Sequence, residues 1–137
     1  MNVLVALAWP NHIHHARAID WFRRIRDDGW ATCPVTETGF VRVSTNLRIF
    51  PDARTPREAI ALLAEIRKLP GHDFWADDVS PADPGAVAFT RAFGHRQITG
   101  AHLITLAIRN NGCLSTFDTG LAELVPEGLR EIIELIP

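Results

Sequence analysis

The sequence predicts an α/β domain built around a parallel sheet, and three observations support this class. Segments of strand type alternate with segments of helix type along the 137 residues, which is the order that a parallel sheet covered on both faces requires. Hydrophobic residues make up 47% of the chain and charged residues 22%, values typical of a globular core. Neither repeats nor low-complexity stretches interrupt the chain. We therefore expect a single domain over residues 1–137.

The elements of the first half follow from caps and hydrophobic spacing. Asn11 is the expected N-cap of a first helix, which Asp27-Asp28-Gly29 ends. Thr55 and Glu58 around Pro56 form a capping box. The expected elements are a helix over 11–25, a strand over Trp30–Cys33, a helix over Thr36–Thr45, a helix from Thr55 to Leu69 and a strand over His72–Ala76.

The second half continues the alternation. A helix is expected near Pro84–Phe93, and Thr99 is the expected N-cap of a helix that runs to Arg109. Apolar runs predict strands over Cys113–Phe117 and Arg130–Ile136. No strand precedes the first helical segment, so the chain opens as if it began in the middle of a fold.

Charge and cysteine content narrow the setting. The net charge of −2 gives no overall basicity, so nucleic-acid binding would need a local basic face. Cys33 and Cys113 lie in apolar segments without zinc-type spacing, and we expect buried thiols in a reducing compartment. No charged region precedes a long apolar run, and Val3–Trp9 is too short to span a bilayer. We expect a cytoplasmic protein without a membrane segment.

Two carboxylates occupy the positions where ligands bind in such folds. Glu37 follows a short strand that passes through Pro34 into a helix, and Asp118 closes the apolar strand that begins at Cys113. Ligands bind at the carboxyl ends of parallel strands. Acids at two such ends predict a shared site for one hard divalent cation, and hence phosphate chemistry. Two acids are few for this purpose, and Asp73, Asp77 and Asp78 are expected at turns or caps instead.

The histidines, serines and tryptophans of the chain are expected to have structural and not catalytic roles. His12, His14 and His15 lack an obvious further metal ligand, which favours a structural cluster at a helix start. No serine lies in a nucleophile elbow, and no segment matches a phosphate-binding loop. The four tryptophans are expected in the core or in dimer contacts.

Four segments in the same order give the chain a family resemblance. These segments are Asn2-Val3-Leu4-Val5-Ala6-Leu7, Pro34-Val35-Thr36-Glu37-Thr38-Gly39-Phe40, Gln97-Ile98-Thr99-Gly100-Ala101-His102-Leu103 and Thr116-Phe117-Asp118-Thr119-Gly120-Leu121, with His72-x-Phe74-Trp75 in support. Through them the sequence resembles PIN-domain ribonucleases, specifically the VapC toxins of bacterial toxin–antitoxin pairs, over its whole length.

The resemblance implies a PIN-like α/β/α sandwich whose acids bind Mg²⁺ or Mn²⁺ for RNA hydrolysis. Glu37 and Asp118 match metal-binding acids, and Thr116 and Asn2 match neighbouring polar residues. The family's first acid and its strand would precede Met1, and Gly100 stands where the family has a catalytic aspartate. We therefore expect an endoribonuclease weakened in this chain, either through a damaged or mis-started sequence or through natural degeneration.

The resemblance also implies partners. Arg42, Arg91 and Arg96 are the basic residues nearest the expected groove and are candidates for RNA phosphate contacts. A cognate antitoxin and a homodimer are the expected protein partners. The alternative function is a non-catalytic PIN-fold protein that sequesters antitoxin or binds RNA.

Overall fold

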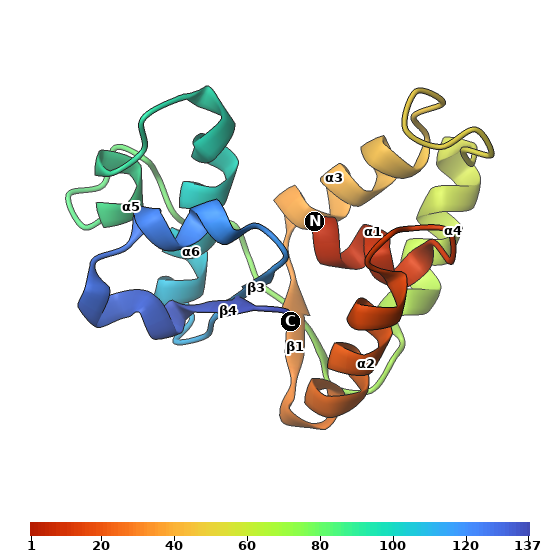
Figure 1. The fold of residues 1–137 in the computed structure, drawn as a ribbon, viewed down its shortest axis with the longest axis horizontal. Coiled ribbons are helices and arrows are strands. Elements are labelled where there is room, and N and C mark those ends of the chain that lie inside the picture. Colours follow the sequence, from red (N-terminus) through yellow and green to blue (C-terminus); the bar gives the residue numbers. More distant parts are fainter. The chain divides into compact units, whose positions relative to one another are not determined.

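The computed structural model describes residues 1–137 and divides into two compact units, unit 1 over Met1–Ala76 and unit 2 over Asp77–Pro137. Each unit contains one pair of parallel strands together with helices (Figure 1). The mixture of helices with strands that pair in parallel confirms the predicted PIN-like α/β class. The prediction of a single PIN-like domain over the whole chain stays a prediction. None of the helices is both long and apolar enough to cross a membrane.

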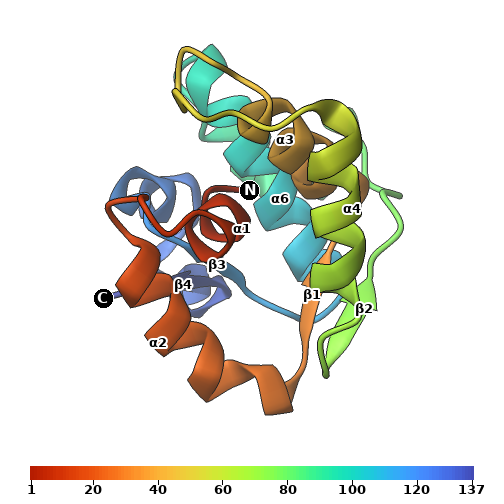
Figure 2. The same cartoon turned by 90° about the vertical axis from the view of Figure 1, so that its right-hand side faces the viewer.

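Unit 1 places its helices around a small aromatic core. Trp9 stacks on Phe50 with ring centroids 4.1 Å apart, and its Nε1 donates to Ser44 Oγ at 3.2 Å. Phe40 is fully buried in the same cluster. Figure 2 shows α3 and α4 side by side. The elements are α1 (Asn2–Ala8), α2 (His15–Ile25), η1 (Arg26–Asp28), β1 (Trp30–Thr32), α3 (Pro34–Ser44), α4 (Pro56–Arg67) and β2 (His72–Phe74).

Two glycines open the strand pair of unit 1. Gly29 and Gly71 precede β1 and β2, with φ of 96° and 81°, a region that glycine enters without steric cost. A Cβ on Gly71 would overlap the carbonyl oxygen of Arg26. The carbonyl of Gly71 accepts a hydrogen bond from the Trp30 amide at 2.9 Å, which starts the register that pairs Trp30 with His72.

Unit 2 packs its helices on the second strand pair. Its core contains Ile104 and Leu124, both fully buried, together with Ala88, Ala101 and Val125. β3 pairs with β4 in parallel, with Leu114 opposite Ile133. The elements are α5 (Val87–Thr90), η2 (His95–Gln97), α6 (Ile98–Arg109), β3 (Leu114–Thr116), η3 (Thr119–Leu124), η4 (Glu127–Ile132) and β4 (Ile133–Leu135).

Two expected helix starts are wrong. Asn11 does not cap a helix, because α2 begins only at His15 and the chain turns between Pro10 and His14. Trp9 is held by the core, so the chain has to reverse after it before a helix can form. Thr99 lies inside α6, whose N-cap is Gln97, because the 3₁₀ turn η2 leads directly into the helix.

Several other boundaries differ from the prediction. The helix expected near Pro84–Phe93 is a single turn, α5. The last strand is confined to β4, because residues up to Ile132 form the 3₁₀ helix η4. Cys33 is buried as expected, whereas Cys113 is exposed since β3 starts one residue after it. The capping box at Thr55 is confirmed.

Candidate carboxylate sites

The start of α3 fixes the position of Glu37. Pro34 occupies the first helical turn, where its missing N–H costs nothing. The Cys33 amide donates to Thr36 Oγ1 at 2.9 Å, which holds the chain at the helix entrance. Glu37 follows in the first turn, where the positive end of the helix dipole favours a negative charge. Local capping therefore places the carboxylate next to β1, the strand that leads into the helix.

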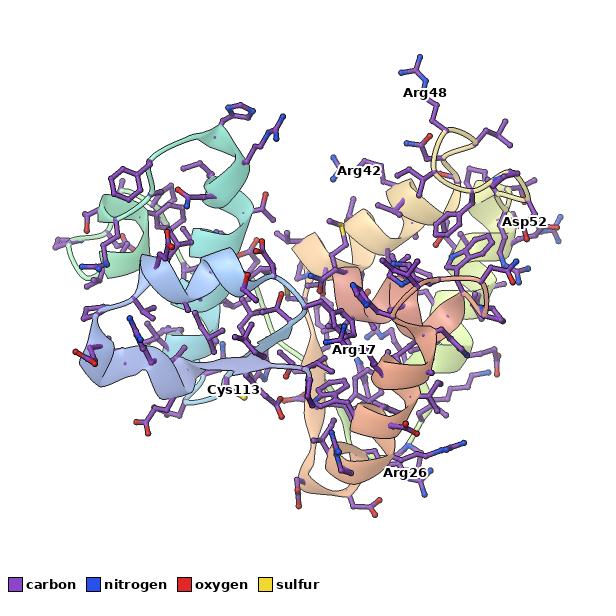
Figure 3. All side chains as sticks on the ribbon, viewed as in Figure 1. Arg17, Arg26, Arg42, Arg48, Asp52 and Cys113 are labelled. Carbon is purple, nitrogen blue, oxygen red and sulfur yellow. The ribbon has the colours of Figure 1, made fainter.

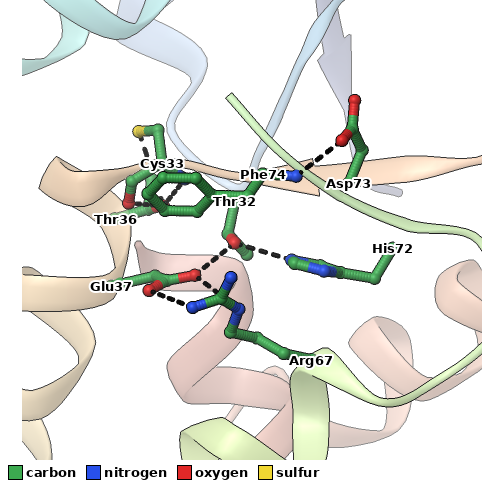
Figure 4. A network of polar contacts seen from close by, with 8 residues as sticks. All are labelled: Thr32, Cys33, Thr36, Glu37, Arg67, His72, Asp73 and Phe74. Atoms are coloured by element: carbon green, nitrogen blue, oxygen red, sulfur yellow. Dashed lines mark hydrogen bonds and ion pairs between the residues drawn. The ribbon is translucent and has the colours of Figure 1, made fainter. Parts of the chain in front are cut away.

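A chain of hydrogen bonds joins Glu37 to both strands of unit 1. Thr32 Oγ1 donates to Glu37 Oε1 at 2.5 Å and lies 2.7 Å from His72 Nε2, as Figure 4 shows. A threonine hydroxyl has a single proton to donate. Because that proton goes to the carboxylate, His72 must donate from Nε2, which assigns the Nε2–H tautomer to its ring. The imidazole, the hydroxyl and the carboxylate thus form one directional chain.

The surroundings favour the neutral form of His72. Burial lowers the pKa of its imidazole below the ordinary value of 6.5, and the positive charge of Arg67 lowers this pKa further. The carboxylates of Glu37 and Asp73 act in the opposite direction with less effect. The hydrogen bond to Thr32 requires a proton on Nε2, and the neutral ring supplies it as the Nε2–H tautomer.

Arg67 forms an ion pair with the same carboxylate. Its Nε lies 3.4 Å from Glu37 Oε1, and its Nη1 donates to Oε2 at 3.5 Å. The guanidinium also lies over the Phe74 ring, 4.9 Å from the ring centroid. The Glu37 side chain is only 14% exposed, against 42% for Arg67. The carboxylate is therefore largely shielded from water, while the guanidinium that pairs with it stays partly in contact with solvent.

Glu37 retains limited capacity for a metal ion. A carboxylate offers about four lone-pair directions; hydrogen bonds from Thr32 and from Arg67 Nη1 occupy two of them, and Arg67 Nε lies 3.4 Å from Oε1. Carboxylate oxygen is the ligand type that Mg²⁺ and Mn²⁺ prefer, and Mg²⁺ commonly binds through one or two carboxylates while keeping several waters. The donor chemistry of Glu37 fits such an ion. Arg67 is the feature of this site that opposes it.

Asp118 stands in a simpler environment in unit 2. It lies two residues beyond the end of β3 and is exposed. Its Oδ1 accepts from the Gly120 amide at 2.9 Å, and its own amide donates to Thr116 Oγ1 at 3.1 Å. Thr116 is buried, and its role beside a metal site stays a prediction. Asp118 Oδ2 is free to meet water or a cation, since the cap at Gly120 uses only Oδ1.

Position 100 faces an apolar side chain. Gly100 is the third residue of α6, and a Cβ built there would overlap Leu121 Cδ2. The tip of a leucine can rotate away, so an aspartate at this position requires a rearrangement of Leu121 but no backbone movement. That this position once carried a catalytic acid stays a prediction.

The other predicted residues lie on several elements. Asn2 opens α1 and lines a 770 Å³ hollow in unit 1 together with His12 and Phe50. Arg42 is exposed on α3, five residues after Glu37 and thus roughly 140° around the helix from it; Figure 3 shows its side chain extending outward. In unit 2, Arg91 donates to the Glu123 carbonyl at 3.2 Å, and Arg96 is exposed in η2.

The three acids that were expected at turns or caps already have partners. Asp73 Oδ1 accepts from the Phe74 amide at 2.8 Å, Asp77 lies 2.7 Å from His102 Nε2, and Asp78 pairs with Arg109 at 3.3 Å. Within neither unit do three or more His, Cys, Asp or Glu side chains gather as a metal site. Glu37 belongs to unit 1 and Asp118 to unit 2, and the prediction that they share one ion stays a prediction.

Three residues around Glu37 were missed as functional candidates by sequence reasoning. Thr32 is the last residue of β1, Arg67 the last of α4 and His72 the first of β2. Arg67 and His72 are 30 and 35 positions away from Glu37 along the chain. The one usable signal was that Arg67 ends a predicted helix and His72 begins the predicted strand that follows it, where side chains of adjoining elements can meet.

The chain combines an α/β fold with an acid in the helix after its first strand and another after its third strand. The chain is 47% identical to Ribonuclease VapC39 of Mycobacterium tuberculosis, over 97% of this chain and 96% of that protein. It is 47% identical to Ribonuclease VapC38, over 99% and 94%, and 37% identical to Ribonuclease VapC44, over 89% and 85%, of the same organism. No family model matches the chain. It belongs to the family of VapC-type PIN-domain toxins.

Proposed function

We propose that this chain is a metal-dependent endoribonuclease of the VapC type, in which Glu37 and Asp118 bind Mg²⁺ or Mn²⁺. The observation that carries this proposal is the 47% identity to Ribonuclease VapC39 over 97% of the chain. The geometry of the two carboxylates supports it, because each follows a strand and is oriented by a hydrogen bond. Hard carboxylate oxygens suit both ions.

The residues of the chain divide the work around the scissile phosphate. When bound, the ion would lower the pKa of a coordinated water and shield the charge of the phosphate. Glu37 is oriented by Thr32 and Asp118 by the Gly120 amide, so neither carboxylate has to be ordered when RNA binds. Preorganised groups of this kind lower the entropic cost of reaching the transition state. Thr116 positions the backbone of Asp118 through its hydroxyl.

We further propose that hydrolysis by this chain is weak. Gly100 carries no carboxylate, and the carboxylate of Glu37 is already paired with Arg67. Losing even an indirect partner of a metal ligand typically costs about 10–100-fold in metal affinity or activity. An aspartate at position 100 would add an acid, and this addition is expected to raise the cleavage rate.

The proposed partners follow from the family. RNA is the substrate and the cytoplasm the place of action, with Arg42, Arg91 and Arg96 as phosphate-binding residues. A cognate antitoxin neutralises the protein, and the active form is a homodimer. Reversing the charge of all three arginines should weaken RNA binding similarly for every sequence and flatten its salt dependence.

The direct test is RNA cleavage in Mg²⁺ or Mn²⁺, with and without EDTA. We expect slow, metal-dependent cleavage that falls at least about 100-fold in Glu37→Gln and in Asp118→Asn. Asp52→Asn is the matched control, because Asp52 is an exposed acid outside this site. Gly100→Asp should cleave faster, and Gly100→Asp with Leu121→Ala gives the new side chain room.

The alternative is a non-catalytic protein that sequesters antitoxin or binds RNA. It would prevail if the original chain and both Gly100 variants are inert while each binds the cognate antitoxin with equal affinity. Cleavage that is unaffected by Glu37→Gln and Asp118→Asn would instead show that a different site, or a contaminant, carries the activity.

A further inference from the structure

We propose that Arg67 is an internal cation that competes with the divalent metal ion for the Glu37 carboxylate. The inference rests on the proposed function, in which Glu37 is a metal ligand, and it adds a residue that sets how tightly the ion binds. Arg67 belongs to no motif of the family resemblance described above. Its position at the end of α4 brings it to Glu37 from 30 residues further along the chain.

The first argument is that Arg67 touches both oxygens that a metal would use. Its Nε is 3.4 Å from Oε1 and its Nη1 is 3.5 Å from Oε2. Thr32 takes a further lone pair of Oε1. A metal ion that binds Glu37 must therefore share the carboxylate with the guanidinium or displace it. In Figure 4 the guanidinium faces the carboxylate on the side away from Cys33.

The second argument is charge. The guanidinium is a cation, so it repels a divalent cation that approaches the same carboxylate. This repulsion is only partly screened, because the Glu37 side chain is 14% exposed and charges shielded from solvent interact more strongly. In the absence of metal, the same guanidinium compensates the carboxylate charge. Arg67 thus stabilises the metal-free site and disfavours the loaded one.

The third argument is that Arg67 has a second interaction partner besides Glu37. The guanidinium lies over the Phe74 ring, a contact that Arg makes well because it is planar and weakly hydrated. Its side chain is 42% exposed, so it can move into solvent without disrupting a core. When a metal ion takes the carboxylate, the ring and the solvent can hold the displaced guanidinium. Exchange between the two cations therefore needs only a side-chain rotation.

The experiment measures Mn²⁺ binding to the full chain by the loss of the free-ion signal in electron paramagnetic resonance. The variants are Arg67→Gln, Arg67→Lys, Glu37→Gln and the matched control Arg57→Gln, which removes an exposed arginine from the other end of α4. We expect Arg67→Gln to bind Mn²⁺ on the order of tenfold more tightly and Arg57→Gln to bind as the original chain does. Arg67→Lys keeps the positive charge but not the planar guanidinium, so its Mn²⁺ affinity should fall between those of Arg67→Gln and the original chain.

The outcomes separate this inference from the proposed function. If Glu37→Gln leaves Mn²⁺ affinity unchanged, or no form of the protein binds Mn²⁺, the assignment of Glu37 as a metal ligand fails and the competition fails with it. If Glu37→Gln weakens binding but Arg67→Gln does not strengthen it, only the competition is overturned. Weaker binding in Arg67→Gln would mean that Arg67 positions Glu37 for the ion.

A second readout does not depend on metal binding. Unfolding in EDTA of the original chain, Arg67→Gln, Glu37→Gln and the double variant gives the coupling between the two side chains. We expect a favourable coupling in EDTA that shrinks when Mn²⁺ is saturating, since the ion then replaces the guanidinium. A coupling that is absent in EDTA, or that does not change with Mn²⁺, would contradict the proposal. Far-ultraviolet circular dichroism confirms that each variant is folded.

Discussion

Glu37 and Asp118 are the same kind of group in opposite kinds of environment. Glu37 is 14% exposed and is engaged by donors from β1 and α4, whereas Asp118 is exposed and caps a turn with one oxygen. The first carboxylate is costly to leave without a cation, because it is shielded from water. The second is solvated without one. Two acids that match the motifs of one family can therefore differ in how readily they would bind a metal ion.

Substitutions in the two hydrophobic cores should change the free energy of unfolding most. Phe40→Ala in unit 1 should lower the free energy of unfolding by about 3–5 kcal/mol and Ile104→Ala in unit 2 by about 2–5 kcal/mol, because both side chains are fully buried. All four tryptophans lie in unit 1, so urea unfolding followed by fluorescence reports on that unit. Circular dichroism reports on both.

Comparing these probes sharpens the distinction between the units. If Phe40→Ala shifts the fluorescence transition and Ile104→Ala shifts only the circular dichroism transition, the two units unfold separately. A single transition shifted equally in both probes by either variant would show that the chain unfolds as one cooperative body. A cost below about 1 kcal/mol for Phe40→Ala would contradict its place in the core.

The next effect concerns two buried threonines, one beside each carboxylate. Thr32→Val should cost about 1–3 kcal/mol of unfolding free energy, because it removes the hydroxyl that donates to the Glu37 carboxylate and leaves the His72 N–H without its acceptor. Thr116→Val removes the acceptor of the Asp118 amide and should cost about 1 kcal/mol. Chemical denaturation of both variants tests the order. Equal costs would mean that Glu37 gains little from its network.

A smaller effect is expected at the cap formed by Asp118. Asp118→Ala removes the acceptor of the Gly120 amide at the start of η3 and should cost about 1 kcal/mol, the usual penalty for a lost N-cap. Asp118→Asn keeps an acceptor oxygen and should cost less. Thermal unfolding of both variants in EDTA measures the difference. If both variants are equally destabilised, the negative charge and not the cap is responsible.

The smallest effect is the pH dependence that arises in unit 1. The pKa of His72 is lowered from 6.5, as is that of His12, where burial acts first and the neighbouring His14 and His15 add to it. The folded state therefore binds these protons less tightly than the unfolded state does. Stability is fully present above about pH 6.5 and falls as the pH drops below that value.

Variants of these histidines test the assignment. Urea midpoints measured between pH 7.5 and pH 5.5 should decrease for the original chain and decrease less for His72→Gln, because glutamine cannot take up a proton while its amide can still donate to Thr32. His12→Gln should also reduce the decrease of the urea midpoint with falling pH, independently of His72→Gln. A slope that neither variant changes would place the pH dependence in other groups.

The sequence supported the fold better than the site. The capping box at Thr55 and Glu58 is local, and the hydrogen bonds that define it span three residues, so the pattern alone was sufficient. The strands at Trp30 and Leu114 were likewise recognisable from short apolar runs between turn signals. Asn11 failed as a cap because the burial of Trp9, a tertiary effect, redirects the chain before α2 can begin.

The environment of Glu37 was not predictable for the same reason. Thr32 lies five residues before Glu37, yet its role depends on His72, which reaches it only through the pairing of β1 with β2. Arg67 is an ordinary basic residue in the last turn of a helix, where such residues are common for local reasons. Only the packing of α4 beside α3 reveals that its side chain meets an acid.

Gly71 has no reactive side chain, yet the hydrogen bonds around Glu37 depend on the turn that it forms. Its backbone lies in the left-handed region, and any side chain would press on the Arg26 carbonyl. Displacing this turn would slide β2 along β1 and carry His72 away from Thr32. A substitution at this turn can therefore disrupt the Glu37 site without replacing any of its polar residues.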